Sequence, residues 1–351
     1  MVMMKRFFVS LLFPTLLAAL LTACESEGLH GDEPTPPTAD LSVHIAVSRA
    51  AASGVSKGAY MGSNLGLTMI YPASDGLDPD NRYNIRWDAD SVQKIRIWYQ
   101  STEGTRTMAW KSSTAAANFF VYAPFVDLPT LPSQLTKIPF KVQSDQTRGL
   151  DSSDFVRDVQ QQVTAAAANG RLQITFTHQL CRLNIKILAG PDTAKQPGLQ
   201  ARITQGMIDT LARCKVGPVC DSINYNLMRY RGYNGKTGTR NDEYPVTTIS
   251  GKKSDSTMVY TFCPTDTNKS VQECILPPQT IQAKDTFIQV LIFNPIECKH
   301  HIFVYRPLQN LVFEAGKEYD MTLELGSTSA EVKTFTITEW KRKKEDVMDL
   351  E

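Results

Sequence analysis

Apolar and polar residues alternate strictly along several short segments, and this alternation constrains the fold more than any other feature of the chain. Residues 319–325 read Tyr-Asp-Met-Thr-Leu-Glu-Leu, and residues 334–338 repeat the pattern with threonine at the polar positions. Successive side chains of a β-strand point to opposite faces of its sheet. The alternation therefore predicts strands that bury one face and expose the other.

The phase of the alternation changes near residue 181. Between residues 174 and 180 the apolar side chains take even positions, whereas between 183 and 187 they take odd positions. A slip of one residue moves every side chain to the other face of a sheet. We therefore expect a β-bulge at Cys181 and Arg182, or a strand that changes its partner there.

Most of the remaining chain is also predicted to form strands. Residues 287–293 are apolar in both phases except at Gln289, which predicts a central strand covered on both faces. Further strands are predicted at residues 94–99, 119–122, 257–262 and 301–305. Many short strands with little helix predict an all-β fold made of β-sandwiches.

Two segments carry helical patterns. In residues 153–169 the apolar side chains Phe155, Val159 and Val163 are spaced by four, a serine precedes them and a glycine follows. Serine caps helix N-termini, and glycine ends helices. We expect a helix there and a weaker one within residues 199–213, so that helix is a minor part of the fold.

The N-terminus carries an export signal. A basic pair precedes an apolar run at residues 7–21, which is too short for a membrane span and fits a secretory signal. Residues 21–24, Leu-Thr-Ala-Cys, resemble the lipobox of bacterial lipoproteins, in which the cysteine takes the lipid. We predict a lipoprotein signal peptide at residues 1–23 and lipidation at Cys24. The alternative is an ordinary signal peptide followed by an unrelated cysteine.

The exported part of the chain divides into a tether and two predicted domains. Residues 24–40 hold three prolines and almost no large apolar side chain, which predicts a flexible tether. The acidic residues just after Cys24 resemble the surface-export signal of Bacteroidetes lipoproteins, and a simple solvated linker is the alternative. About 310 residues remain, which suggests two domains of ordinary size. We place them at residues 41–168 and 169–351.

The charge balance excludes one class of partner. Of the 37 basic residues two lie in the signal peptide, which leaves 35 against 36 acidic residues. A chain with this balance has no basic field to attract nucleic acid.

Six cysteines follow the lipidation site. Export brings them to a compartment that permits disulfides, and six cysteines allow 15 pairings. Cys214 and Cys220 could close a local loop, and the sequence favours at least one disulfide. The alternative is that all are buried free thiols, since cysteine packs as a small apolar residue. The six are Cys181, Cys214, Cys220, Cys263, Cys274 and Cys298.

The sequence does not indicate catalytic, cofactor or metal chemistry. His178 lies on the apolar phase of its predicted strand, which favours a core histidine over a catalytic one. Cys298 with His300 and His301 could suggest a metal site, but zinc sites need four ligands in complementary pairs. A turn before a strand is the favoured interpretation. We therefore predict a protein that is not an enzyme and holds neither cofactor nor metal.

Seven short motifs follow one another between residues 119 and 340. They are Tyr-x-Pro at 122–124, Asp-Gln at 145–146, an aspartate-led segment at 151–156, Phe-x-His at 176–178, Pro-Gln-Thr at 278–280, Ala-Gly-x-x-Tyr at 315–319 and Ile-Thr-x-Trp at 337–340. This succession, behind a lipobox, resembles the fimbrillin-like (Mfa-like) family of Bacteroidetes surface lipoproteins. Residues 41–118 match that family only loosely.

The resemblance implies two transthyretin-like β-sandwich domains in tandem and a structural or adhesive role in a surface fimbria, the type V pilus. In that family a trypsin-like protease cuts after an arginine near the first strand and removes the lipid and that strand. Arg49 suits this cleavage best, and residues 41–47 would be the removed strand. The alternative is that residues 41–47 stay in place and Arg49 is a surface residue.

The resemblance also implies partners and a location. Other pilus subunits would bind when a strand from one copy completes the open groove of the next, and residues 334–338, or the region after them, are the candidate donor. The lipid would anchor the chain in the outer membrane at the cell surface, where a host or bacterial ligand could bind. The charged tail after Trp340 argues against a stalk position and for a tip or accessory one.

Two other functions remain as alternatives. The first is a surface lipoprotein that never polymerises and binds glycans or host ligands. Four tryptophans could then line a sugar-binding face, although core positions are the favoured interpretation; they are Trp87, Trp98, Trp110 and Trp340. The second is a hydrolase, against which the lack of a paired nucleophile and base weighs.

Overall fold

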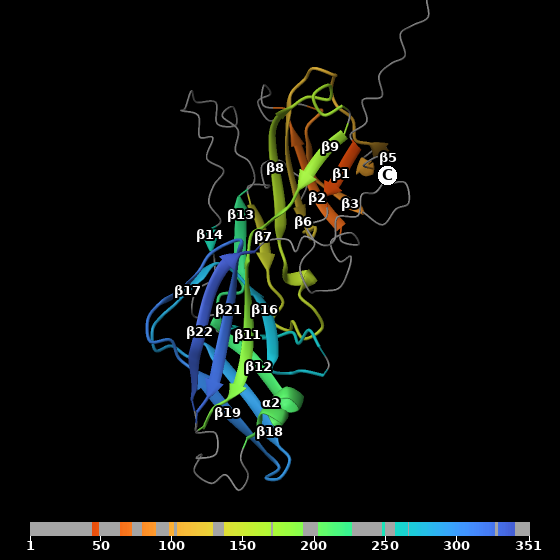
Figure 1. The fold of residues 1–351 in the computed structure, drawn as a ribbon. Helices are drawn as coiled ribbons and strands as arrows, with labels where there is room; N and C mark the ends of the chain where they lie inside the picture. The colour runs from red at the N-terminus through yellow and green to blue at the C-terminus, as the bar shows by residue number, and fades with distance from the viewer. Residues whose placement is uncertain are drawn as a thin grey trace, which may run out of the picture. The chain divides into compact units, whose positions relative to one another are not determined.

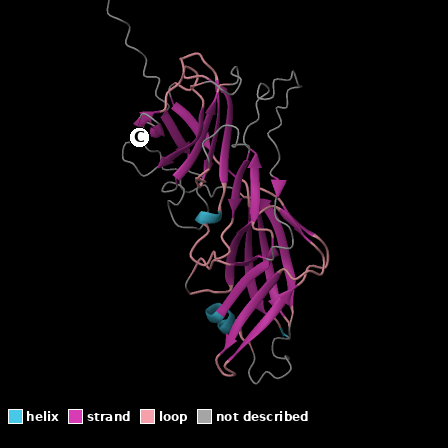
Figure 2. Ribbon diagram, turned by 180° about the vertical axis from the view of Figure 1, so that it is seen from behind, coloured by secondary structure: helices cyan, strands magenta, loops and turns pink. Residues whose placement is uncertain are grey.

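The computed structural model describes twelve segments of the chain, all within one compact unit, Asp40–Glu351. Most of these residues lie in strands, and helix is limited to α2 (Gln205–Leu211) and the 3-10 turn η1 (Asp151–Ser153) (Figure 2). In these segments no helix has the length and apolar character that a membrane crossing needs. The described residues are 44–48, 64–71, 79–88, 98–101, 104–128, 137–169, 171–191, 203–226, 248–249, 257–265, 267–326 and 329–340.

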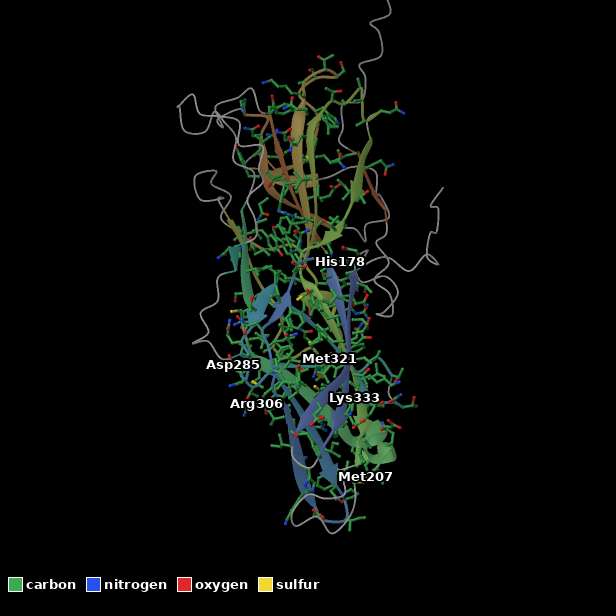
Figure 3. All side chains as sticks on the ribbon, turned by 60° about the vertical axis from the view of Figure 1, so that its left-hand side comes forward. His178, Met207, Asp285, Arg306, Met321 and Lys333 are labelled. Atoms are coloured by element: carbon green, nitrogen blue, oxygen red, sulfur yellow. The ribbon has the colours of Figure 1, made fainter. Side chains whose placement is uncertain are left out.

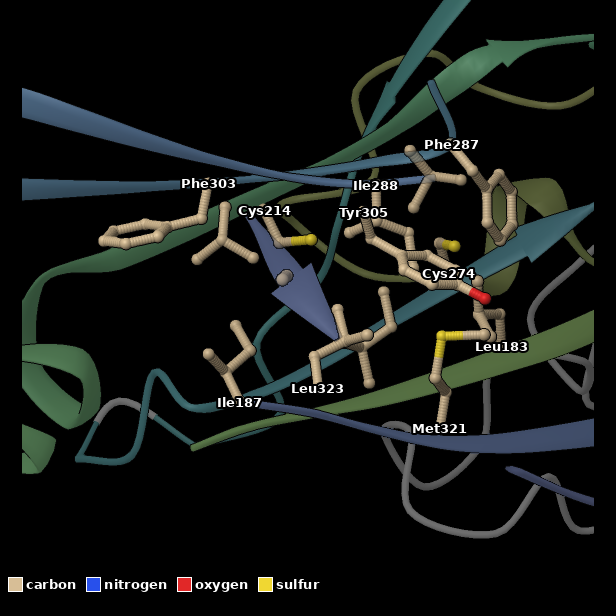
Figure 4. Close-up of a cluster of buried hydrophobic side chains, with 14 of the residues drawn as sticks. Leu183, Ile187, Cys214, Cys274, Phe287, Ile288, Phe303, Tyr305, Met321 and Leu323 are labelled. Atoms are coloured by element: carbon tan, nitrogen blue, oxygen red, sulfur yellow. The ribbon is translucent and has the colours of Figure 1, made fainter. Parts of the chain in front are cut away.

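Two four-stranded sheets form a sandwich in the C-terminal part (Figure 1). One sheet has the order β16 (Val271–Leu276), β11 (Cys181–Ala189), β21 (Lys317–Leu325) and β22 (Ala330–Glu339). The other has the order β15 (Thr257–Tyr260), β12 (Ala212–Val219), β18 (Ile288–Asn294) and β19 (Lys299–Tyr305). Buried side chains from both sheets meet in one C-terminal cluster, which includes Leu183, Leu323, Cys214 and Ile288 (Figure 4).

A five-stranded sheet organises the N-terminal part. Its order is β10 (Thr177–His178), β8 (Val156–Val163), β6 (Ala117–Ala123), β2 (Asn64–Ile70) and β3 (Arg82–Asp88). Two small sheets accompany it, β1 (His44–Ser48) with β9 (Arg171–Thr175) and β4 (Trp98–Ser101) with β5 (Gly104–Thr107). An N-terminal cluster of buried side chains includes Leu67, Phe119 and Val121, together with Leu172 and Ile174 of β9.

A third cluster of buried side chains, here called the junction cluster, joins residues from both parts. Strand β6 is buried along its whole length, so that Phe119 and Val121 face the N-terminal cluster while Phe120 and Tyr122 face the junction cluster. Strand β7 (Lys137–Lys141) pairs with β13 (Ser222–Asn226), which also pairs with β14 (Thr248–Ile249). Strands β17 (Gln279–Ile281) and β20 (Leu311–Phe313) form a further small sheet.

The predicted all-β sandwich fold is confirmed, and so are its most regular strands. In β21 the apolar positions of the alternation are buried and the polar ones are at least partly exposed. Strand β18 lies between β12 and β19, as expected of a central strand. The phase change at residue 181 is a change of partner, because β10 pairs with β8 whereas β11 pairs with β16 and β21.

The helix predicted at residues 153–169 is wrong. Its main part is strand β8, which pairs with β6 and β10, and residues 165–169 form turns. A spacing of four fits a strand as well as a helix, because four is a multiple of the strand period of two. Phe155 and Val159 both contribute to the junction cluster. The weaker prediction within residues 199–213 is confirmed by α2, which Thr204 caps by accepting a hydrogen bond from Met207 N at 3.3 Å.

Candidate functional site

Strand β1 pairs with β9 and, within the described segments, with no other strand. The pairing is parallel and includes all five residues from His44 to Ser48, and Figure 1 draws the two strands side by side. Leu172 and Ile174 of β9 are 1% and 0% exposed in the N-terminal cluster. If β1 were removed, the backbone of a strand that is firmly seated in the core would lose its partner.

Side chains of β8 hydrogen-bond other backbone groups of β9. Asp158 Oδ2 accepts a hydrogen bond from Thr175 N at 2.9 Å, and Gln160 Nε2 donates to Gln173 O. Thr175 N and Gln173 O therefore have partners without β1. The backbone groups of β9 that pair with β1 are the ones that would be left open to a new strand. The sequence analysis predicted a helix at residues 153–169, and therefore it did not predict these contacts between β8 and β9.

The two residues predicted from the N-terminal sequence, Cys24 and Arg49, lie outside the described residues, as do residues 41–43. Lipidation and cleavage there stay predictions. Strand β1 ends at Ser48, one residue before Arg49. A cut after Arg49 would therefore release β1 as a whole.

Strand β22 contains the candidate donor segment 334–338 and belongs to its own sandwich. It pairs antiparallel with β21 from its first residue to its last. Val332 and Phe335 pack against the C-terminal cluster, whereas Ile337 is 54% exposed. Donation of this strand to another copy would require it to leave β21.

The residue after β22 anchors that strand. Trp340 is 7% exposed, and its ring stacks on His178 with centroids 3.8 Å apart and 8° between the planes. Trp340 N donates to Gly316 O at 2.8 Å. His178 Nδ1, in turn, lies 2.9 Å from Asp154 Oδ2. His178 (labelled in Figure 3) is thus a core histidine with a structural partner, as the sequence analysis favoured.

The glutamine of the Asp-Gln motif acts as a substitute for a neighbouring strand. Gln146 is fully buried. Its Oε1 accepts a hydrogen bond from Ile275 N at 2.8 Å, and its Nε2 donates to Ile275 O at 2.9 Å. Ile275 lies in β16, an edge strand of its sheet. The amide therefore satisfies backbone groups that would otherwise be buried without partners.

Two other motifs make similar backbone contacts. Gln279 Oε1 accepts from Cys220 N at 2.9 Å, and its Nε2 donates to Cys220 O at 3.2 Å. In the Ala-Gly-x-x-Tyr turn the Tyr319 hydroxyl accepts from Glu314 N at 2.7 Å. Gly316 has φ +72°, a conformation that favours glycine over other residues.

The Tyr-x-Pro motif places an aromatic ring at the centre of the junction cluster. The Tyr122 hydroxyl donates to Asn84 Oδ1 at 2.6 Å, and burial raises the pKa of this hydroxyl. A Cβ on Gly66 would meet the Tyr122 ring at 2.1 Å, so glycine makes room for it. The ring stacks on Phe155, which stacks on Tyr225 with centroids 4.2 Å apart. The Asp-Gln, Pro-Gln-Thr, Ala-Gly-x-x-Tyr and Tyr-x-Pro motifs therefore make contacts that stabilise the fold.

None of the six cysteines forms a disulfide, contrary to the expectation of at least one. Cys181, Cys214 and Cys274 are buried in the C-terminal cluster, and Figure 4 labels Cys214 and Cys274. Burial raises the pKa of each of these three thiols, to about 12 for Cys214. The alternative of buried free thiols holds for these three, and Cys298 is exposed.

The other candidate residues are engaged in structural contacts. His301 Nε2 lies 3.0 Å from Glu297 Oε2, and the His300 ring lies 5.1 Å from the ring of Phe293. No three metal-ligating side chains gather anywhere in the described segments. Trp110, like Trp340, is buried in the core and not on a binding face. The side chains of Trp87 and Trp98 lie outside the described residues.

A family model described as fimbrillin-like matches residues 83–340, which is more than half of the chain. A crystal structure of a putative cell adhesion protein from Bacteroides uniformis has a TM-score of 0.56 and 15% identity, and the match covers 86% of this chain and 100% of that one. A putative cell adhesion protein from Bacteroides ovatus has a TM-score of 0.52 and 13% identity, with 87% and 98% covered. No curated protein sequence matches this chain significantly. At these identities the structures show a shared fold.

Proposed function

This chain belongs to the fimbrillin-like family, and we propose that it is a structural or adhesive subunit of a bacterial surface fimbria that joins other subunits by strand exchange. It would be exported as a lipoprotein, anchored in the outer membrane through Cys24, and then cut after Arg49. The observation that carries the proposal is the pairing of β1, the strand just before Arg49, with β9 alone among the described strands.

Strand exchange follows from what the loss of β1 would leave behind. The β9 backbone would keep its hydrogen bonds to Asp158 and Gln160 but lose its parallel partner. A buried backbone group without a partner costs about 1–3 kcal/mol. An extended segment from another subunit would satisfy those backbone groups. Because β1 pairs with β9 alone among the described strands, its loss would leave a position on β9 where a donor strand could pair.

Two segments of a neighbouring copy are candidate donors. The first is β22 itself, which would have to give up β21 and withdraw Trp340 from His178. The second is residues 341–351, the region that directly follows Trp340. The second donor leaves the C-terminal sandwich of the donating copy intact, whereas the first opens it.

The test is cleavage of the purified full chain by an arginine-specific protease. We expect a cut after Arg49, followed by SDS-resistant multimers in unheated samples. The Arg49→Ala variant is the matched control and should stay monomeric under the same treatment. If the wild-type chain is cut after Arg49, remains folded and forms no multimers, strand exchange is wrong, and a surface lipoprotein that binds ligands without polymerising becomes the better description.

Synthetic peptides identify the donor. Peptides of residues 330–340 and 341–351 are added to cleaved and to uncleaved protein, with scrambled peptides as controls. We expect one of the two to bind cleaved protein and to block multimers, and neither to bind uncleaved protein. Binding that is equal before and after cleavage would contradict a site opened by the loss of β1.

A further inference from the structure

Strand β8 carries two polar side chains on the face that it turns to the N-terminal cluster. Val156 belongs to that cluster, and Asp158 and Gln160 follow it at the strand period of two, so all three side chains point to one face. Phe155, just before β8, and Val159 contribute to the junction cluster on the other face. A polar side chain on a core face costs free energy unless it is hydrogen-bonded. Asp158 and Gln160 therefore need partners on this side of the sheet.

A β-bulge returns the strand to its apolar pattern directly after these two residues. The register with β6 shifts just after Gln160. Gln162 has φ +53°, and its backbone N donates to Asn118 Oδ1 at 2.6 Å. Because the bulge adds one residue, Val163 packs against the same N-terminal cluster as Val156. The two polar positions are therefore a local interruption of a strand face that is otherwise apolar.

The partners of both side chains are backbone groups of β9. Asp158 Oδ2 accepts a hydrogen bond from Thr175 N at 2.9 Å, and Gln160 Nε2 donates to Gln173 O. Gln160 Nε2 also donates to Asp158 Oδ2 at 3.0 Å, so the two side chains hold each other. We call this pair the β8 clamp. Alternate residues of a strand direct their backbone groups to the same edge, so β9 meets the clamp with one edge and β1 with the other.

Without the β8 clamp, β9 could pair with β8 through the backbone. Strand β10 follows β9 after Phe176 alone and pairs antiparallel with β8 in the register Thr177↔Arg157. Continued toward β9, this register places Thr175 opposite Val159. Among the described strands only β10 pairs with this edge of β8. Direct pairing of β9 with β8 is therefore the arrangement that competes with the observed one.

The backbone groups of Val159 point to that edge. Gln179 N donates to Phe155 O at 2.9 Å on the β10 side of β8, and residues an even number apart in a strand share an edge. In the competing arrangement Thr175 N would exchange the Asp158 carboxylate for the Val159 carbonyl, and the carboxylate is the stronger acceptor. A β9 that paired there would leave the position in which it pairs with β1.

We propose that the β8 clamp holds β9 away from the edge of β8, so that the place of β1 stays open to an incoming strand after β1 is lost. Asp158 and Gln160 are then positioning residues for strand exchange, and this role rests on the proposed function. The apparent dissociation constant of a strand rises as the fraction of molecules with β9 in place falls. The clamp keeps that fraction high, and it occupies the other edge of β9, so a donor enters only where β1 was.

The test uses full chains in which the recognition site of a sequence-specific viral protease is inserted after Ser48, so that the release of β1 does not depend on cleavage after Arg49. Three proteins are compared. The parent has no other change, the double variant carries Asp158→Leu with Gln160→Leu, and the matched control carries Gln161→Leu, at an exposed position of the same strand. Thermal melting before the cut shows that each protein is folded.

After the cut, the released segment is removed in mild urea, and a fluorescent peptide of residues 41–48 is added at a protein concentration too low for multimers. We expect the parent and Gln161→Leu to bind the peptide equally. The double variant should bind it about tenfold more weakly, which corresponds to β9 in place in about one molecule in ten. Asp158→Asn keeps an oxygen that accepts from Thr175 N and should bind nearly as the parent does. No binding by the folded, cut parent, or equal binding by the double variant, would overturn the proposal.

Hydrogen exchange locates β9 in the same cut proteins. If β9 pairs with β8 when the clamp is missing, the Val159 amide should exchange about tenfold more slowly in the double variant than in the parent. A clamp that only stabilised the fold would give the opposite change, because its removal would speed exchange. Unchanged or faster exchange therefore contradicts the proposal. Asp158→Leu alone replaces the double variant in both measurements if the double variant does not fold.

The outcomes for the clamp and for strand exchange are separate. A cut parent that binds the peptide but forms no multimers at high concentration contradicts strand exchange and leaves the clamp in place. A double variant that forms multimers as fast as the parent contradicts the clamp and leaves strand exchange in place.

Discussion

The first and the last described strands are both edge strands, but they are held in different ways. Strand β1 has five residues, runs parallel to β9 and is described without a second partner strand. Strand β22 has ten residues, runs antiparallel to β21 and ends at Trp340, which is buried on His178. Strand β1 is therefore held by a short run of backbone pairing, whereas β22 is held by a long run and by the stacking of Trp340.

This difference determines which strand can leave. Parallel pairing is slightly less stable per residue than antiparallel pairing, and loss of β1 leaves all other described sheets complete. Loss of β22 would uncover one side of the C-terminal cluster, because Val332 and Phe335 pack against it. By these contacts we expect β1 to be lost more easily than β22 as long as Trp340 stays packed on His178.

The largest expected effect comes from removing that anchor. Trp340→Ala deletes a buried indole that stacks on His178 and should lower the free energy of unfolding by about 3–5 kcal/mol. Ile337→Ala, on the exposed part of the same strand, is the control and should cost about 1 kcal/mol. Urea unfolding measures both. Equal effects of the two substitutions would mean that β22 is held by its ladder alone, and the comparison of the two strands would lose its basis.

The next effect concerns the strand that carries β1. Ile174→Ala leaves a cavity in the N-terminal cluster beneath β9 and should cost about 2–4 kcal/mol. A loosened β9 should also open the β1 pairing more often, so cleavage after Arg49 should be faster than in wild type. Thr175→Ala changes an exposed side chain of the same strand and serves as the control. If Ile174→Ala lowers the stability but does not speed cleavage after Arg49, the pairing of β1 does not depend on β9.

The sequence predicted correctly those elements whose apolar pattern fits either the strand period or the helix period, but not both. Strand β21 alternates over seven residues, and a helix cannot reproduce that pattern. The phase change at residue 181 also had a local cause, since the chain passes there from one sheet to another. Strand β8 was missed because Phe155, Val159 and Val163 satisfy both periods. Its state depends on β6 and β10, and tertiary pairing overrides local pattern in such segments.

The motifs were visible in the sequence, but their physical roles were not. Gln146 and Gln279 each pair both amide atoms with the backbone of one distant residue, and nothing near them in sequence indicates Ile275 or Cys220. The fate of the cysteines was open for a similar reason. Whether two thiols can bond depends on the distance between their Cα atoms, which spacing along the chain does not give.

The smallest effect concerns the ion pair at the end of β22, and it tests whether charge or packing holds that end. The hydrogen bond to Glu339 raises the pKa of the Lys317 ammonium group. A folded-state pKa above the unfolded value adds stability that is fully present below the unfolded pKa and is lost as the pH rises through the folded one. Glu339→Gln should therefore lower the melting temperature slightly at pH 7 and have no effect once Lys317 has lost its proton. High salt should shrink the difference in the same way, because both side chains face solvent. The control is a double-mutant cycle with Lys317→Gln, which isolates the pair from other effects of each substitution. A difference that persists at alkaline pH would assign the effect to packing, and the end of β22 would then depend on more than Trp340.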